Sequence, residues 1–302
     1  APTQRQGMRL AAIDIGSNAV RLIVKEVRGE RGSLKVRKLA HTRVPIRLGE
    51  DVFGFGSIGT KKERLLGQAL EGFGMLMQAM QVSEFRACAT SAMREADNGT
   101  DILNRLAAST GIQVELINGK TEADLIFSNF EVSLFDRDRD YIYIDVGGGS
   151  TELTLIRQGT RVEGRSFKLG AVRLLKDKVD DSIWHEINAW CSRLSAERGL
   201  NAPLAIGAGG NINRLFKLGG CQSGEVLSFD RLASLVELLN GSSYEERMSR
   251  FRLKPDRADV IVPAGRIYLD AMSMVGAEGI LVPKVGLADG IILSLYHQLN
   301  RP

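Results

Sequence analysis

Apolar residues recur along the chain at two spacings, and the order of these spacings predicts a mixed α/β fold. Short apolar runs bounded by Gly, Asn or Ser are typical of strands. Apolar positions three and four residues apart, as in residues 61–81, are typical of amphipathic helices. The expected strands are 10–15, 20–27, 34–40, 85–90, 114–117, 141–147, 151–156, 161–167 and 204–206. The expected helices are 61–81, 100–110, 121–130, 181–198, 211–218, 228–240, 257–274 and 287–299. Strands and helices that follow one another in this way indicate the α/β class.

One sequence pattern, a strand, an Asp-x-Gly turn and a second strand, occurs in both halves of the chain. Asp14 and Asp145 each stand near the end of an apolar strand, and each is followed two residues later by a glycine and then by a second strand. This similarity predicts an internal duplication of a βββαβα unit, with the two halves facing one another across a cleft.

The domains are expected at residues 1–124 and 125–302, and the last helix, residues 287–299, is free to pack back on the first domain. A cluster of charged residues at 137–140 is expected to be a solvated linker. A calcium loop is disfavoured there because the required glycine and the distal glutamate are missing.

Composition narrows the functional classes. The chain has 302 residues, of which 44% are hydrophobic and 25% charged, and it carries three cysteines and a net charge of +4. Three scattered cysteines argue against a disulfide framework or a paired-cysteine zinc site and suit a reducing, cytoplasmic compartment. No apolar run is long enough to span a membrane, and residues 1–7 lack the layout of a secretion signal. No block of basic residues suggests a nucleic-acid arm, so the mild positive charge indicates either an ordinary solvated surface or a groove for an anionic ligand.

Glycine-rich turns follow three of the expected strands, at residues 14–18, 145–152 and 207–211. Glycine lets backbone N–H groups converge on an anion, and serine and threonine hydroxyls add donors. One such turn alone is equally consistent with a tight hairpin. Three of them, two led by an aspartate in duplicated frames, favour phosphate cradles. The residues expected to bind phosphate in these turns are Gly16, Ser17, Asn18, Gly147, Gly148, Gly149, Ser150, Thr151, Gly209 and Gly210.

The carboxylates of the turns require a different role. Asp14, Asp145 and Glu152 repel phosphate, whereas carboxylates beside phosphate loops commonly hold Mg²⁺. Asp145 and Glu152 lie on opposite arms of an expected hairpin, so both can flank one site. The alternative for Glu152 is an exposed strand carboxylate. A P-loop ending at Thr121 is improbable, because the position of its first glycine is held by Val114.

These motifs make the chain similar to the exopolyphosphatase and guanosine pentaphosphate phosphatase family, within the actin/hexokinase superfamily. The similarity spans nearly the whole chain and rests on the motifs Asp14-x-Gly-Ser-Asn, Arg47-Leu48-Gly49-Glu50, Ala89-Thr90-Ser91-Ala92-x-Arg94, Asn118-Gly119-x-x-Glu122-Ala123, Asp145-x-Gly-Gly-Gly-Ser-Thr-Glu-Leu153, Gly207-x-Gly-Gly and Arg257-Ala258-Asp259. The resemblance implies two duplicated ribonuclease H-like, actin-like ATPase domains flanking a central cleft, in the short, two-domain form of the family.

The resemblance also implies residue roles. Glu122 matches the general base that readies a water molecule for attack on a terminal phosphoryl group, and Arg94 matches a group that holds the phosphate chain. Asp145 and Glu152 match the acidic pair associated with Mg²⁺. The sequence departs from many relatives at Thr121, where a second acid is common, and at Asn211, where threonine is usual. A homodimer is expected because the family commonly pairs.

The resulting expectation is Mg²⁺-dependent hydrolysis of the terminal phosphate of inorganic polyphosphate, releasing orthophosphate. One alternative is removal of the 5′-terminal phosphate of guanosine pentaphosphate by the same residues. A kinase fits less well, because Glu122 suits water activation. A non-catalytic sensor of polyphosphate or alarmone is the remaining alternative, and it is disfavoured because Glu122 and the acidic pair are present.

Overall fold

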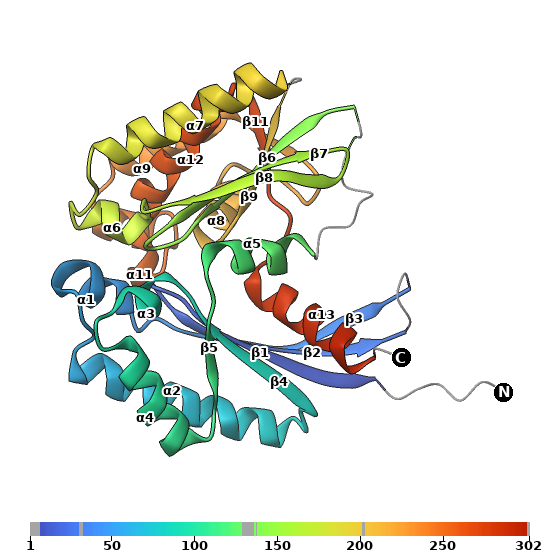
Figure 1. Cartoon of the computed structure of the whole chain (residues 1–302). Coiled ribbons are helices and arrows are strands. Elements are labelled where there is room, and N and C mark those ends of the chain that lie inside the picture. Colours follow the sequence, from blue (N-terminus) through green and yellow to red (C-terminus); the bar gives the residue numbers. More distant parts are fainter. Residues whose placement is uncertain (1–6, 30–32, 129–135, 137, 201–202, 301–302) are drawn as a thin grey trace. The chain divides into compact units, whose positions relative to one another are not determined.

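The computed structural model divides the chain into two compact units (Figure 1). The first comprises residues 1–129 and 286–302, and the second comprises residues 130–285. The division falls after residue 129, whereas the expected boundary, after residue 124, falls inside a helix. The structure describes residues 7–29, 33–128, 136, 138–200 and 203–300.

A five-stranded sheet with the order β3-β2-β1-β4-β5 forms the centre of the first unit. β1, β2 and β3 pair antiparallel, and β4 and β5 continue the sheet parallel to β1. The strands are β1 (Met8–Ile15), β2 (Val20–Arg28), β3 (Lys35–Val44), β4 (Glu84–Ala89) and β5 (Val114–Leu116). The last six residues of β1 are all buried, since β1 is the central strand of the sheet and α13 packs against it.

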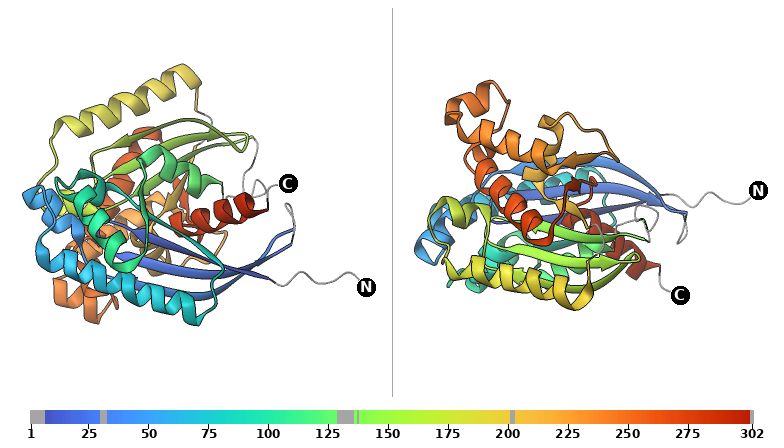
Figure 2. Two further views of the ribbon diagram at one scale, coloured as in Figure 1. Left: turned by 60° about the horizontal axis from the view of Figure 1, so that its bottom comes forward. Right: turned by 90° about the horizontal axis from the view of Figure 1, so that it is seen from above.

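Helices of the first unit pack on both faces of its sheet (Figures 1 and 2). α2 and α4 contact each other on one face, whereas α13 lies on the other face against β1, β2, β4 and α5. The helices are α1 (Leu48–Phe55), α2 (Thr60–Ala79), α3 (Ser91–Glu95), α4 (Gly99–Thr110), α5 (Gly119–Phe127) and α13 (Leu287–Leu299). The chain therefore returns to its first unit at its end.

The second unit contains a six-stranded sheet with the order β10-β11-β9-β6-β7-β8. Its strands are β6 (Asp140–Val146), β7 (Thr151–Arg157), β8 (Thr160–Phe167), β9 (Leu204–Ala208), β10 (Val226–Ser228) and β11 (Gly279–Leu281). Its helices are α6 (Ala171–Leu175), α7 (Ser182–Arg198), α8 (Gly210–Leu218), α9 (Phe229–Asn240), α10 (Tyr244–Ser249), α11 (Pro255–Ala258) and α12 (Ile261–Val275). α12 contacts α6, α7, α8 and α9, so it is the central helix of this unit.

The two sheets repeat one topology. The order β3-β2-β1-β4-β5 in the first unit corresponds to β8-β7-β6-β9-β11 in the second, with the same parallel and antiparallel pairings. β10 is an addition that pairs antiparallel with β11 at the edge. The predicted α/β class and the predicted duplication are both confirmed.

Short elements are the main departures from the sequence prediction. α1, α3, α6, α10, β10 and β11 were not expected, because three to eight residues are too few to show a period. The helix expected at 257–274 is instead two helices, α11 and α12. The helices expected from residues 100 and 121 begin at Gly99 and Gly119 instead, and residues 129 and 130 lie outside the described part of the chain.

The expected solvated linker at 137–140 is wrong at its last residue. Asp140 belongs to β6 and is 3% exposed. Arg157 holds it with two hydrogen bonds of 2.7 Å, from Nε to Oδ1 and from Nη2 to Oδ2. This paired geometry offsets the cost of burying the carboxylate. Residue 137 lies outside the described residues.

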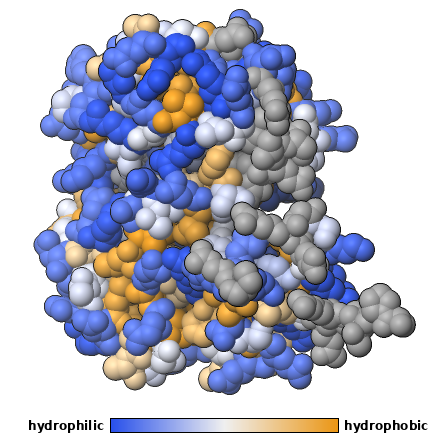
Figure 3. Space-filling view, turned by 45° about the vertical axis from the view of Figure 1, so that its right-hand side comes forward, coloured by the Kyte–Doolittle hydropathy of each residue, from blue (hydrophilic) through white to orange (hydrophobic). Residues whose placement is uncertain are grey.

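The visible surface is mainly hydrophilic, with apolar side chains exposed in the lower part of the view (Figure 3). Exposed apolar residues of the first unit include Phe55, Met75 and Phe85. Within the described residues, no helix combines the length and apolar character that crossing a membrane requires.

Candidate active site

The predicted site residues of the first unit gather where its parallel strands end. β1 runs into the loop at Gly16, β4 into α3 with Arg94, and β5 into α5 with Glu122. The pairing of β1 and β4 continues beyond the end of β4, because Thr90 N–H donates a hydrogen bond to the carbonyl oxygen of Ile15 at 3.1 Å. Ligands of α/β proteins commonly bind at the carboxyl ends of parallel strands.

Glu122 lies in the first turn of α5 and is half-buried. Asn118 caps this helix, and its side chain accepts a hydrogen bond from Thr121 N–H at 2.8 Å. Arg94 Nη1 donates to the carbonyl oxygen of Ile117 at 2.6 Å. The predicted phosphate-binding arginine therefore fixes the junction from which the helix carrying Glu122 starts.

The first glycine turn is held by a hydroxyl pair and by α1. Ser17 Oγ lies 2.9 Å from Ser91 Oγ at the start of α3. The carbonyl oxygens of Ser17 and Asn18 accept hydrogen bonds from Gly49 N–H at 2.8 Å and Arg47 N–H at 3.1 Å. In a trans peptide the N–H points away from the carbonyl oxygen, so the donor face of this turn is directed away from α1.

Asp14 forms an ion pair with the residue opposite it on the neighbouring strand. Arg21 on β2 is paired with Asp14 on β1, and its Nη1 lies 2.8 Å from Asp14 Oδ2. This pair neutralises a carboxylate that is only 6% exposed. Asp14 was predicted as a Mg²⁺ ligand, and Arg21 competes for the same carboxylate.

The second unit places two acids where the first places an acid and an arginine. Asp145 on β6 lies directly opposite Glu152 on β7, in the register that pairs Asp14 with Arg21. The two carboxylates therefore project from neighbouring strands on the same face of the sheet. Glu152 is 4% exposed, so the alternative of an exposed strand carboxylate is wrong.

Hydroxyl groups donate to both of these acids. Tyr143 Oη donates to Asp145 Oδ2 at 3.2 Å. Ser150 Oγ and Ser166 Oγ donate to Glu152 Oε1 at 2.9 and 2.8 Å. Neutral donors stabilise the charged form without removing its charge, so the acidic pair keeps its attraction for a cation.

The carbonyl oxygens of Gly147, Gly148 and Gly149 are turned toward one short helix, α6. Ala171 N–H donates to the first at 2.9 Å, and two further N–H groups of α6 donate to the second. Arg173 Nε donates to the third at 3.0 Å. The peptide N–H groups of this turn are thereby directed to the opposite side, which is the arrangement of an anion cradle.

A Leu-Gly pair contacts the glycine turn in each unit. The pair is residues 48–49 in the first unit and residues 169–170 in the second. Leu48 and Leu169 are fully buried. A Cβ on Gly170 would lie 2.3 Å from the carbonyl oxygen of Gly148, so only glycine fits there. The sequence analysis named the first pair only within a family motif and missed its repeat, which the strings Arg-Leu-Gly and Lys-Leu-Gly show in the two halves.

The third glycine turn lies beside Asp145. Gly209 has a φ of 115°, and a Cβ there would be 3.6 Å from Asp145 Oδ1. Tyr268, also missed in the sequence, accepts a hydrogen bond from Val146 N–H and donates one to Ala208 O, so it joins the ends of β6 and β9. Burial raises the pKa of Tyr268 well above its usual value, which keeps this hydroxyl protonated.

The end of α8 and an arginine give the third turn positive character. α8 begins at Gly210, and helix N-termini favour anions. Arg257 reaches the same place, since a Cβ on Gly210 would lie 2.8 Å from Arg257 Nη2. The effect of Asn211 on this turn stays open in the structure. Phosphate binding by all three glycine turns stays a prediction.

The acidic side chains decide whether the site suits a metal ion. Among the described residues, no group of three or more His, Cys, Asp or Glu side chains is placed to hold an ion. Asp145 and Glu152 nevertheless suit Mg²⁺, which usually keeps several waters and binds through one or two carboxylates together with substrate phosphates.

Cys88 lies beside Asp14, because the two residues are paired in the register of β4 and β1. Burial raises the pKa of this thiol to about 12, and the Asp14 and Glu122 carboxylates act in the same direction. Burial also raises the pKa of Cys191 to about 12. Both thiols therefore stay protonated at neutral pH, and the thiolate is the reactive form.

Alkylation with iodoacetamide at pH 8 is expected to modify Cys221, which is partly exposed, well before Cys88 and Cys191. Mass spectrometry of peptides from native and denatured protein measures the order of labelling. Denaturant should make all three cysteines react at similar rates. Native labelling of Cys88 as fast as that of Cys221 would contradict the burial described here.

Comparison with known proteins identifies the family. The model of the Ppx/GppA phosphatase family matches residues 22–299. The chain belongs to this family. It is therefore a phosphatase by membership, and the predicted resemblance is confirmed.

Curated relatives cover nearly the whole chain. Exopolyphosphatase 1 of Mycobacterium bovis is 25% identical over 95% of this chain and 88% of its own length. Exopolyphosphatase 2 of Mycobacterium tuberculosis is 29% identical over 95% of this chain and 98% of its own length.

Solved structures agree on the fold. An exopolyphosphatase from Cytophaga hutchinsonii gives a TM-score of 0.80 at 23% identity, covering 97% of this chain and 98% of the other. A Ppx/GppA family member from Aquifex aeolicus gives 0.75 at 23% identity, covering 98% and 100%.

Proposed function

We propose that the protein is an exopolyphosphatase that hydrolyses the terminal phosphoanhydride bond of inorganic polyphosphate and releases orthophosphate. The observation that carries this proposal is the turn at residues 147–149, whose carbonyl oxygens are all held by α6 and which joins the strands that carry Asp145 and Glu152. Backbone donors next to two carboxylates suit a phosphate chain together with its counter-cation. The names of the curated relatives support the same substrate class.

The reaction assigns one proton acceptor. Glu122 takes a proton from water as the water oxygen forms a bond to the terminal phosphorus, and the bridging P–O bond breaks. The electron pair of that bond leaves with the shortened chain. Positioning and charge neutralisation dominate such transfers, so one base and fixed donors suffice.

Asp145 and Glu152 are the residues that would hold Mg²⁺. Bound there, the ion would neutralise charge on the phosphoryl group during its transfer. Arg94 and the first turn would hold the phosphate chain in the first unit. The hydroxyls of Ser150 and Thr151 lie next to the second turn, although Thr151 Oγ1 already donates to Leu169 O at 2.5 Å.

Orthophosphate release is expected from short and long polyphosphate with Mg²⁺ present, and not with excess chelator. The measurement compares both polyphosphates with guanosine pentaphosphate at equal concentrations of terminal phosphate. Release from guanosine pentaphosphate alone would establish the alternative phosphohydrolase. Binding without release from any substrate would establish a sensor. Full activity in chelator would overturn the assignment of Asp145 and Glu152.

A further inference from the structure

The first glycine turn depends on a residue with an unfavourable backbone conformation. Arg47, the N-cap of α1, has φ 60° and ψ 48°, the left-handed region that residues with a Cβ avoid. Its N–H donates to the carbonyl oxygen of Asn18, and Gly49 N–H donates to that of Ser17. These two hydrogen bonds tie the turn to the start of α1, so whatever stabilises the conformation of Arg47 also helps to position the turn.

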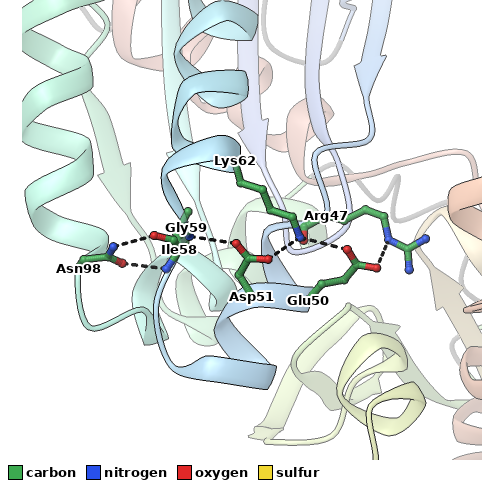
Figure 4. A network of polar contacts seen from close by, with 7 residues as sticks. All are labelled: Arg47, Glu50, Asp51, Ile58, Gly59, Lys62 and Asn98. Atoms are coloured by element: carbon green, nitrogen blue, oxygen red, sulfur yellow. Dashed lines mark hydrogen bonds and ion pairs between the residues drawn. The ribbon is translucent and has the colours of Figure 1, made fainter.

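Lys62 at the start of α2 supplies that stabilisation (Figure 4). Its Nζ donates to the carbonyl oxygen of Arg47 at 2.5 Å and to Glu50 Oε2 at 3.1 Å. It also lies 2.8 Å from Asp51 Oδ1. Glu50 in turn forms an ion pair with Arg47 Nε at 2.9 Å. Lys62 thus fixes the carbonyl of Arg47 directly and the Arg47 side chain through Glu50.

The same contacts continue to the helix that carries Arg94. Asp51 Oδ2 accepts a hydrogen bond from Gly59 N–H at 2.9 Å. Asn98, just after α3, bonds both backbone groups of Ile58, at 3.0 and 2.8 Å. At the other end of α3, Ser91 Oγ lies 2.9 Å from Ser17 Oγ, so the chain of contacts returns to the turn from which it started.

Lys62 does not bind substrate in this arrangement. An ammonium group has three hydrogen-bond donors, and Lys62 Nζ already faces three oxygen atoms. Its side chain is also only 16% exposed. To contact phosphate directly, Lys62 would have to give up one of these three oxygen atoms. Two of them belong to the carboxylates of Glu50 and Asp51, whose mutual repulsion Lys62 now offsets.

We propose that Lys62 is a positioning residue, which fixes the first glycine turn and the start of α3 relative to each other for binding of the phosphate chain. The proposal rests on the proposed function. It assigns to Lys62 an effect on substrate affinity through Arg47, without contact to the reacting atoms.

Lys62→Met is expected to raise KM for polyphosphate by about 10-fold, since small displacements of positioning groups have large effects. Its kcat should change little, because contacts made equally in the ground and transition states affect KM alone. Lys61→Met is the matched control, because it removes the same charge from the adjacent and exposed residue. Lys62→Arg keeps the charge with a different shape and should recover only part of the loss.

A second measurement does not depend on turnover. Hydrogen exchange of the amides of Arg47 and Gly49 should accelerate in Lys62→Met and remain unchanged in Lys61→Met. If Lys62→Met does not fold, Glu50→Gln should show the same changes to a smaller extent. Unchanged exchange and KM in Lys62→Met, or equal effects of the two lysine variants, would overturn the proposal. If the wild type fails to hydrolyse polyphosphate, the proposed function fails while the exchange experiment still tests Lys62.

Discussion

Glu122→Gln is expected to lower kcat by a factor of about 10² to 10⁴, which is the usual contribution of a general base. Glutamine has the shape of glutamate but does not accept a proton from water at neutral pH. α5 should remain intact, because its cap is the Asn118 side chain and its start is held by Arg94. The affinity for the phosphate chain should therefore stay close to that of the wild type. Steady-state phosphate release and equilibrium binding of inorganic tripolyphosphate measure the two quantities.

Asp124→Asn is the control for this variant. Asp124 lies on the same helix and is exposed, so its substitution removes one negative charge from α5 without touching the assigned base. Its kcat should match that of the wild type. Normal turnover by Glu122→Gln, or an equal loss in both variants, would show that Glu122 does not carry the proton transfer.

Much of the fold could be predicted because the two halves of the chain repeat one sequence pattern and can be compared with each other. The common pattern around Asp14 and Asp145 predicted a duplicated unit, and the two sheets do share one strand order. The glycine turns at the ends of β1 and β6 were located for the same reason, and the turn after β9 was located from its own run of glycines. A strand that must be buried on both faces is apolar throughout, which makes it easy to identify in sequence.

The supports of the site could not be predicted, because they depend on contacts between residues far apart in the chain. Arg173 holds Gly149, and Lys62 holds Arg47, from short helices or helix ends with no period of their own. The role of Tyr268 likewise follows only from its place between Val146 and Ala208. The sequence was enough to locate the turns. The direction in which their N–H groups point depends on the contacts that hold their carbonyl oxygens.

The duplication also shows how the two units differ in chemistry. At one register position the first unit pairs an acid with Arg21, and the second pairs an acid with Glu152. The first pair joins an acid to a base, whereas the second brings two acids together, with hydroxyl groups of Tyr143 and Ser150 donating to them. A cation is therefore better accommodated by the second unit, and the assignment of Mg²⁺ to Asp145 and Glu152 is favoured over Asp14.

Gly170→Ala is expected to reduce kcat/KM for polyphosphate by about 100-fold, an effect typical of displacing a positioning group. The new Cβ would lie 2.3 Å from Gly148 O and 2.4 Å from Gly149 N, distances at which the turn must move. Any such movement disturbs the hydrogen bonds by which α6 directs the carbonyl oxygens of residues 147–149. Overpacking of this kind also costs about 1–3 kcal/mol of stability.

Gly72→Ala separates the effect on the turn from a general effect of adding a methyl group. Gly72 is exposed within α2, and a Cβ there meets no atom within 4 Å. Alanine is the better helix former, so this variant should gain about 1 kcal/mol of stability and keep its kcat/KM. Thermal unfolding and phosphate release measure both quantities for each variant. Wild-type kcat/KM in Gly170→Ala would show that the turn tolerates displacement, and the donor face described for residues 147–149 would then not be the phosphate cradle.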